Sequence, residues 1–262
     1  MSKKYDLLII IPCYNEAERL PTESYIDFLN NHERVMLCFV NDGSTDATDM
    51  VLADIGKQFP GQVNIIRQPK NLGKAEAVRT GILFCHKNYE AERLAYLDAD
   101  LSTSLEECKS ISRIITVTSS TLFVFGSRIS KLGSTIHRKR YRFLIGRAIA
   151  TLISIQLGLK VYDTQCGCKV FKSSLIEPLF KEKFISRWLF DVELFHRLIR
   201  IYGRDKLKYL AKEIPLQRWC DTNDSRVCIS YFPKLWMDLR NIYRAYNLAN
   251  EDFQVERETI FN

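Results

Sequence analysis

Residues 94–100 read LAYLDAD, an apolar stretch that ends abruptly in two carboxylates separated by one alanine. A continuous apolar run of this kind is typical of a strand buried on both faces of a sheet. Asp98 and Asp100 offer hard oxygen ligands, and alternating carboxylates at a strand end can share one divalent cation with phosphate oxygens. The stretch predicts a buried strand followed by a Mn²⁺ or Mg²⁺ site, the alternative being two solvated carboxylates in a turn.

Strand and helix patterns alternate on both sides of this stretch. The order strand, helix, strand requires right-handed crossovers, so we expect an α/β fold with a mostly parallel central sheet flanked by helices. Ser44 or Thr45 is expected to cap the helix that runs towards Phe59. The other expected elements are strands at 7–11, 35–40, 63–66, 94–97 and 122–125 and helices at 22–31, 74–89 and 104–117.

Polar residues follow four of these strands at the point where each strand ends. Ligands bind beyond the carboxyl ends of the strands in such sheets, so these side chains are expected to meet at one site. Lys74, which begins a predicted helix, could reach a phosphate there with the help of free backbone N–H groups. The alternatives are that Asp42 belongs to a turn followed by a helix cap, and that Lys74 is an ordinary solvated lysine. The residues after the strands are Asn15 and Glu16, Asp42, Asp98 and Asp100, and Ser127 and Arg128.

Positive charge is concentrated in one part of the chain. The 262 residues are 46% hydrophobic, enough to bury one large core, and carry a formal net charge of +7, which suits an anionic partner such as a nucleotide or phospholipid surface. Every charged residue between 128 and 147 is basic. One basic loop is not the pattern of a nucleic-acid interface, where basic and aromatic residues interleave along a face. The basic residues are Arg128, Lys131, Arg138, Lys139, Arg140, Arg142 and Arg147.

The second half of the chain departs from the alternating pattern. Residues 142–159 are apolar with a basic flank, which predicts either a core helix or an amphipathic helix on a membrane surface. The remaining expectations are helices at 187–201 and 231–248 and a strand at 207–214, within a domain at 1–230 and a C-terminal helical extension at 231–262.

Two acids, Asp191 and Glu193, lie in the apolar start of one of these helices. Acids in apolar surroundings are rarely left unpaired. Asp191 is therefore a candidate general base. The alternative is a structural acid with a partner, for which nearby Arg187 is available.

The eight cysteines are expected to be reduced thiols. The polar start of the chain lacks the pattern of a signal peptide, and Cys166 and Cys168 lack the spacing of a zinc site. A cytoplasmic location follows as the expectation. A transmembrane helix needs about 18 consecutive apolar residues, and no apolar run in the sequence is that long. Any membrane contact is therefore expected to be peripheral, on the cytoplasmic face.

Seven motifs follow one another along the chain: IIIPCYNEAERL (9–20), VNDGSTDAT (40–48), NLGKAEAVRTG (71–81), YLDADLST (96–103), GSR (126–128), GLKVYDTQCGCKVF (158–171) and FDVE (190–193). In this order they resemble the family 2 glycosyltransferases, and among them the polyprenyl-phosphate (dolichyl-phosphate) glucosyl- and mannosyltransferases. The resemblance implies a GT-A fold, a Rossmann-like arrangement with a mostly parallel central sheet.

The resemblance also implies roles for individual residues. Asp42 would hold the base or ribose, Asp98 the ribose and metal-bound waters, and Asp100 the metal itself. Lys74 or Arg128 would stabilise the leaving diphosphate. The nucleotide pocket would be lined by Pro12, Tyr14, Asn15 and Glu16, and the acceptor phosphate would be bound by Ser127, Arg128, Arg138, Arg140 and Arg226. The stretch with Asp163, Gln165 and Lys169 would follow the membrane-facing helix.

These expectations combine into an inverting, metal-dependent transfer of a hexose from a UDP- or GDP-sugar to polyprenyl phosphate. An acceptor phosphate is already ionised, so this reaction needs no strong general base. A first alternative is a family 2 enzyme acting on a sugar hydroxyl in polysaccharide or glycoconjugate synthesis, for which Asp191 would be the base. A second is a non-catalytic nucleotide-binding module on a membrane surface. The patterns predict no oligomeric state.

Overall fold

A seven-stranded sheet forms the centre of the molecule in the computed structural model, which describes residues 4–137, 140–220 and 234–247. The strand order is β3-β2-β1-β4-β7-β5-β8, and every strand is parallel to its neighbours except β7, which is antiparallel to β4 and β5. The predicted mostly parallel α/β sheet is confirmed. The strands are β1 (Lys4–Cys13), β2 (Val35–Asn41), β3 (Val63–Arg67), β4 (Glu90–Leu97), β5 (Phe123–Ser127), β7 (Cys168–Lys172) and β8 (Ala211–Pro215).

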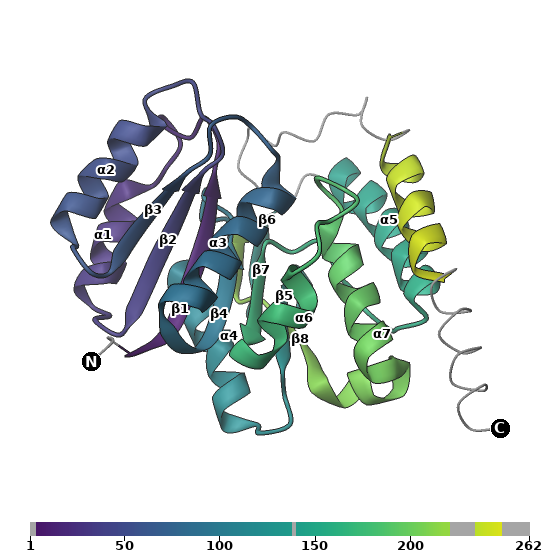
Figure 1. The fold of residues 1–262 in the computed structure, drawn as a ribbon. Coiled ribbons are helices and arrows are strands. Elements are labelled where there is room, and N and C mark those ends of the chain that lie inside the picture. Colours follow the sequence, from purple (N-terminus) through teal and green to yellow (C-terminus); the bar gives the residue numbers. More distant parts are fainter. Residues whose placement is uncertain (1–3, 138–139, 221–233, 248–262) are drawn as a thin grey trace.

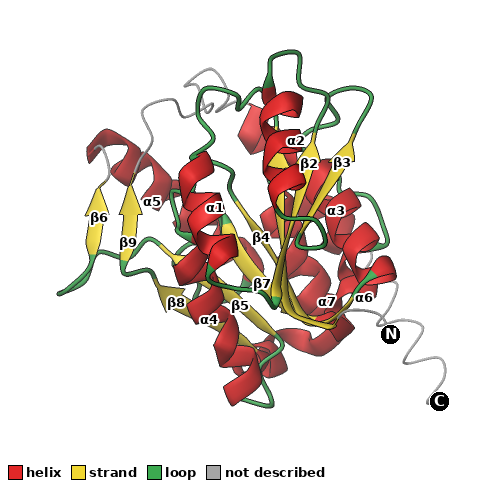
Figure 2. Cartoon of the chain, turned by 90° about the vertical axis from the view of Figure 1, so that its left-hand side faces the viewer, coloured by secondary structure: helices red, strands yellow, loops and turns green. Residues whose placement is uncertain are grey.

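Helices cover both faces of this sheet, as Figures 1 and 2 show. One apolar core joins the sheet to α1 (Thr22–Asn30), α2 (Thr48–Gln58) and α4 (Leu105–Val117). The other joins it to α3 (Lys74–Asn88), α6 (Ile176–Phe180) and α7 (Phe190–Leu210), with the short 3₁₀ helix η1 (Ser173–Leu175) leading into α6. Alternate residues of each strand supply the two cores because side chains of a strand point to opposite faces.

The register of the central strands aligns the polar residues that follow them. Pro12 of β1 pairs with Val40 of β2, so the loops after these strands leave the sheet at the same level. Antiparallel β7 then carries its first residues to the end of β4, where the Asp98 N–H donates to Gly167 O at 3.1 Å. The carboxyl ends of β1, β2, β4 and β5 thus share one edge of the sheet.

The predicted cap of α2 is wrong. The helix begins at Thr48, and neither Ser44 nor Thr45 caps it. The Ser44 hydroxyl instead accepts from the Asn15 N–H at 3.0 Å, and the Thr45 N–H donates to Asn15 Oδ1 at 2.9 Å. Both residues are held by the loop after β1, which is a tertiary contact that helix-capping rules do not contain.

The second half differs from its expected boundaries. Residues 207–210, expected in a strand, continue α7, which bends at Gly203 (φ 76°), and β8 begins only at Ala211. An additional two-stranded sheet joins β6 (Thr135–His137) to β9 (Arg218–Cys220), and Figure 2 shows it at the side of the molecule. Its strands of three residues carry too little pattern to be found in a sequence.

One end of the molecule is helical. Figure 1 shows α5 (Arg140–Leu157) beside α7 and the helix at 234–247. Ile153 and Leu157 of α5 are buried, as are Leu239 and Ile242 of the C-terminal helix. Of the described helices, none combines the length and apolarity needed to cross a membrane. The seven described cysteines are free thiols.

Candidate functional site

The loops after β1 and β2 are joined through Asn15. This residue has a left-handed backbone (φ 49°), and asparagine tolerates that conformation better than most residues. Its N–H and its side-chain oxygen contact Ser44 and Thr45, while the Glu16 N–H donates to Thr48 Oγ1 at 2.8 Å. Asn15 and Glu16 are predicted to line the nucleotide pocket. In the structure, their contacts join the loop after β1 to the segment at 44–48, which follows β2. Pro12 and Tyr14 flank them, both half-buried.

Asp42 is a buried carboxylate bound by backbone groups. Its Oδ1 accepts from the Leu72 N–H and its Oδ2 from the Gly73 N–H, each at 2.8 Å. Burial raises the pKa of Asp42, and the two hydrogen bonds oppose that rise. Each carboxylate oxygen has a second lone pair, so a ligand hydroxyl or base N–H remains a feasible further donor. Asp42 thereby ties the β2 loop to the start of α3.

Arg187 holds the same loop from the other side, and the sequence reasoning gave it no such role. Its guanidinium donates to the carbonyls of Asn71 and Leu72 at 3.1 and 2.9 Å and to Asn71 Oδ1 at 2.7 Å. Its own carbonyl accepts from the Ala75 N–H at 3.1 Å. A Cβ on Gly73 (φ 97°) would lie 2.6 Å from Arg187 Nε. The glycine of NLGK is therefore the one feature of the sequence that could have indicated a side chain packed closely against this loop.

Lys74 and Asp98 form an ion pair at the carboxyl end of β4. Nζ of Lys74 lies 2.5 Å from Asp98 Oδ1. Burial opposes the charge of Lys74, but the attraction of Asp98, followed by that of Asp191, outweighs it and raises the pKa of Lys74. Gly167 makes room for this pair, because a Cβ there would overlap the Asp98 carboxylate. Lys74, which is predicted to reach a phosphate, therefore lies beside Asp98, and its role at a phosphate stays a prediction.

The loop of Asp100 is ordered by its own neighbours. Asp100 Oδ1 accepts from the N–H and the hydroxyl of Ser102 at 3.0 and 2.8 Å, and Oδ2 lies 4.0 Å from the Arg19 guanidinium. The Tyr25 hydroxyl donates to the Ala99 carbonyl at 2.9 Å and fixes the residue between the two aspartates.

The carboxylates of Asp98 and Asp100 fit a divalent cation that binds together with the phosphate groups of a substrate. Within the described part of the chain, no group of three or more metal-ligating side chains gathers. Mg²⁺ is commonly held by only one or two carboxylates together with substrate phosphates. Each aspartate faces a cation in the structure, Lys74 or Arg19, so the site already attracts positive charge. Asp98 and Asp100 are the residues that would hold the metal.

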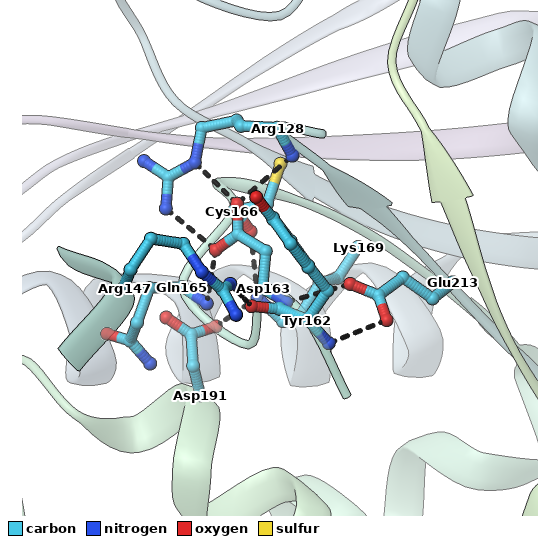
Figure 3. A network of polar contacts seen from close by, with 9 residues as sticks. All are labelled: Arg128, Arg147, Tyr162, Asp163, Gln165, Cys166, Lys169, Asp191 and Glu213. Carbon is cyan, nitrogen blue, oxygen red and sulfur yellow. Dashed lines mark hydrogen bonds and ion pairs between the residues drawn. The ribbon is translucent and has the colours of Figure 1, made fainter. Parts of the chain in front are cut away.

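Arg128 forms the centre of a second network (Figure 3). Its guanidinium makes a bidentate contact with Asp163 at 2.6 and 2.7 Å, and its N–H donates to the same carboxylate at 3.1 Å. Burial disfavours the charge on Arg128, but Asp163 outweighs this and raises its pKa. Glu213 of β8 orders the segment further, since it accepts from the N–H groups of Tyr162 and Asp163 at 2.9 and 2.8 Å.

Further polar atoms surround this network. Arg147 stacks on the Tyr162 ring at 3.6 Å and donates to the Tyr162 carbonyl at 2.7 Å. Ser127 Oγ and Thr164 Oγ1 are buried and make no hydrogen bond to the residues that the structure describes. Buried hydroxyls without a partner are uncommon in proteins, and a ligand oxygen would satisfy them. Ser127 and Arg128 lie beside the segment at 162–165, and their role at the acceptor phosphate stays a prediction.

Asp191 is buried at the start of α7. Its Oδ1 lies 2.6 Å from Lys169 Nζ and accepts a hydrogen bond from the Tyr96 hydroxyl. Glu193 follows two residues later on α7 and accepts from the N–H groups of Ile185 and Ser186 at 2.9 and 2.8 Å. Both acids in FDVE therefore have partners: Glu193 binds backbone N–H groups, whereas Asp191 binds the side chains of Lys169 and Tyr96.

The remaining predicted acceptor residues have no described position. Arg138 and Arg226 lie outside the described residues, and the side chain of Arg140 does as well. Their predicted role at the acceptor phosphate stays a prediction.

The family model for glycosyl transferase family 2 matches residues 8–180. The chain is 30% identical to the dolichyl-phosphate beta-glucosyltransferase of Saccharomyces cerevisiae, over 93% of this chain and 75% of that protein. It is 29% identical to dolichyl-phosphate beta-glucosyltransferase ALG5D of Trichomonas vaginalis, over 91% of this chain and 73% of that protein.

Solved structures share the fold. The chain superimposes on glucosyl-3-phosphoglycerate synthase from Mycobacterium tuberculosis, crystallised with Mn²⁺, uridine diphosphate and glucosyl-3-phosphoglycerate, with a TM-score of 0.63. The two are 18% identical, and the match covers 94% of this chain and 79% of that one. The matched model, the relatives and the arrangement of carboxylates and lysine at the end of β4 agree: this chain belongs to glycosyl transferase family 2.

Proposed function

We propose that the protein transfers glucose from UDP-glucose to dolichyl phosphate, or a related polyprenyl phosphate, with inversion at the transferred carbon. The observation that carries the proposal is the pairing of Lys74 with Asp98 beside Asp100 at the carboxyl end of β4, in a chain whose relatives are named dolichyl-phosphate beta-glucosyltransferases. UDP is preferred to GDP because the solved neighbour was crystallised with UDP-glucose.

The donor site would work through charge. Mn²⁺ or Mg²⁺ held by Asp98 and Asp100 would supply Lewis-acid stabilisation of the leaving diphosphate. Lys74 would turn from Asp98 towards a diphosphate oxygen, a charge-assisted contact at the start of α3 where backbone N–H groups also favour an anion. Asp42 would accept from the base or the ribose while Leu72 and Gly73 hold its carboxylate.

The acceptor would approach from the side of Arg128. A phosphate monoester is already ionised and can attack without a strong base. Arg128, Arg147 and the buried hydroxyl of Ser127 lie together at this side, and each could donate to phosphate oxygens. Asp163 orients the Arg128 guanidinium but also occupies it, so binding of the acceptor would require the phosphate to share or replace this contact.

The lipid tail would be accommodated at the helical end of the molecule. Leu144 and Ile155 of α5 and Trp236 and Met237 of the C-terminal helix are exposed apolar side chains. Exposed apolar side chains with basic neighbours suit a peripheral contact with a membrane surface.

The alternative of a sugar hydroxyl as acceptor requires Asp191 as the base. Asp191 Oδ1 is already engaged by Lys169 and Tyr96, which favours a fixed role over proton transfer. We therefore keep the phosphate acceptor as the proposal.

The test is release of UDP or GDP from a panel of nucleotide-sugars, with Mn²⁺, Mg²⁺ or EDTA, in the presence and absence of a short-chain dolichyl phosphate. We expect UDP release from UDP-glucose that needs both the metal and the lipid phosphate, and a lipid-linked glucose as product. Metal-dependent release at the same rate with and without the lipid would contradict the proposal that a lipid phosphate is the acceptor. Release from GDP-mannose alone would contradict the proposal that UDP-glucose is the donor.

Asp191→Asn separates the two acceptor chemistries in the same assay. Transfer to a hydroxyl should be abolished by this change, whereas transfer to a phosphate should keep a measurable rate because no proton has to be removed.

A further inference from the structure

Lys169 is a fully buried lysine in the middle of the sheet. It lies on β7 between β4 and β5, and its side chain has an exposed fraction of 0%. Its register partner Tyr96 and its strand neighbour Phe171 belong to the core beneath α3, α6 and α7. Lysine is almost never fully buried unless it is paired, because the isolated charge loses its hydration.

Two contacts compensate this charge. Nζ of Lys169 lies 2.6 Å from Asp191 Oδ1 and donates to the Cys166 carbonyl at 2.8 Å. The Tyr96 hydroxyl donates to the same oxygen of Asp191. Two residues that face each other across β4 and β7 therefore converge on one carboxylate oxygen from the first turn of α7, and neither of them occupies the other oxygen, Oδ2.

Stability alone is a weak reason for such an arrangement. Replacing a buried ion pair by apolar residues of similar volume is often neutral or stabilising, because burial costs both ions their hydration. A Met at position 169 would fit the apolar pattern of this face. The ion pair is better explained by the position in which it holds the Asp191 carboxylate.

That position is next to the donor site. Tyr96 lies on β4, and Asp98 follows two residues later, directly after the end of that strand. Burial, Asp98 and then Asp191 are the main influences on the pKa of Lys74, which places the Asp191 carboxylate within electrostatic reach of the Lys74–Asp98 pair. Lys169 also contacts Cys166, which adjoins the Gly167 that makes room for Asp98.

We propose that Lys169 is a positioning residue for the donor sugar. With Tyr96 it holds Asp191 beside the Lys74–Asp98 pair, with Oδ1 bound and Oδ2 left to accept a hydrogen bond from a hydroxyl group of the transferred hexose. The inference rests on the nucleotide-sugar donor of the proposed function and is independent of the acceptor.

The test compares Lys169→Met, Asp191→Asn, the double variant and Lys172→Met, a control on the same strand with a half-buried lysine. Dissociation constants are measured for UDP-glucose and for UDP, together with kcat, KM for UDP-glucose and the midpoint of urea unfolding. We expect Lys169→Met to weaken UDP-glucose relative to UDP by about 10-fold, because a hydrogen bond to a charged group is misplaced. The kcat of Lys169→Met should fall about 100-fold, while its affinity for UDP stays as in the wild type. The control Lys172→Met should keep the wild-type kcat and both wild-type affinities.

The double variant decides between a positioning role and a structural one. It leaves no buried charge without a partner, so its unfolding midpoint should return towards that of the wild type. Its kcat and its affinity ratio should remain as poor as those of Asp191→Asn, because Lys169 acts only through Asp191. Recovery of the ratio and of kcat along with stability would show a merely structural pair and overturn the proposal.

A further loss when Lys169→Met is added to Asp191→Asn would equally overturn it, since Lys169 would then act on its own. The acceptor is tested separately. A wild-type protein that binds UDP-glucose but does not glucosylate dolichyl phosphate would refute the proposed acceptor, and the two affinities would still decide the role of Lys169.

Discussion

The two sides of the site are held together by different kinds of contact. On the donor side, the loops after β1 and β2 and the start of α3 are joined mainly by backbone N–H groups that donate to side chains, as at Asp42 and Asn15. Elsewhere in the site, charged side chains make the main connections: Arg128, which follows β5, pairs with Asp163, and Lys169 of β7 pairs with Asp191 of α7.

The difference bears on how each side can respond to a ligand. A carboxylate held by two backbone N–H groups keeps its place, because those groups belong to helix and loop backbone that is itself packed. A charged pair can exchange one partner for a phosphate or a sugar hydroxyl without breaking a backbone hydrogen bond. We expect the loops held by Asp42 and Asn15 to be preformed, and the side of Arg128 to rearrange when the acceptor binds.

The largest effect is expected from removing the proposed metal ligand Asp100. Asp100→Asn should lower kcat for glucose transfer on the order of 10³-fold, because a metal contributes several kcal/mol to stabilising the leaving diphosphate. Titration of Mn²⁺ and Mg²⁺ in the transfer assay measures the change. Asp54→Asn, which alters an exposed carboxylate paired with Lys57, is the control. Unchanged metal dependence in Asp100→Asn would exclude Asp100 as the ligand.

The contact between the two sides is tested by Gly167→Ala. The added Cβ overlaps the Asp98 carboxylate, so Asp98 must move away from Lys74 and from the donor site. We expect about a 100-fold loss of kcat, the size that a displacement of about 1 Å can cause. Steady-state kinetics and a thermal melt are the measurements. A variant with wild-type kcat would mean that the position of Asp98 does not depend on β7.

Matched substitutions compare the two kinds of contact directly. Asp163→Asn leaves the Arg128 guanidinium without its ionic partner and should lower the free energy of unfolding by about 3 kcal/mol. Asp42→Asn replaces one of two acceptor oxygens with a donor and should cost about 1–2 kcal/mol. Urea unfolding at pH 7 measures both. The comparison fails if Asp42→Asn is the more destabilising change.

The last prediction concerns pH and the helical end of the molecule. His196 packs against Tyr246 of the C-terminal helix, and burial, helped by Arg204, lowers its pKa to about 4. The unfolded chain takes up this proton near pH 6.5, so the stabilising contribution is complete above that pH and is lost as the pH falls towards 4. Between pH 6.5 and 4.5 the loss should be roughly 2 kcal/mol.

His196→Gln should flatten this part of the profile when unfolding is measured between pH 4 and 7. His86→Gln, which alters a half-buried histidine hydrogen-bonded to Ser173, serves as the control. A wild-type stability that stays constant over this range would contradict the assignment.

Local patterns were sufficient for the first half of the fold. The strands expected at 35–40 and 63–66 appear close to their bounds because each is a short apolar run ended by a turn. Those expected at 7–11 and 94–97 are the apolar parts of longer strands, Lys4–Cys13 and Glu90–Leu97. The expectation failed where a distant residue decided the outcome. Ser44 and Thr45 have the chemistry of helix caps, but Asn15 binds them both.

The candidate site shows the same division. The positions of Lys74, Asp98 and Asp100 follow from strand ends and a helix start, which are local signals. The roles of Arg187 and Lys169 do not, because their partners lie far away along the chain: Arg187 contacts the loop at 71–72, and Lys169 contacts Asp191.

The amino-acid sequence alone therefore determined the α/β class, the alternation of elements and the chemical types at the strand ends, since these depend on the apolar period and on turn residues. Only the tertiary structure decided which charged groups meet. Antiparallel β7 lies between β4 and β5. This position brings Gly167, the residue before β7, against Asp98 and brings Lys169 into contact with Asp191. Strand order in a sheet is set by the packing of the whole chain, and no local pattern encodes it.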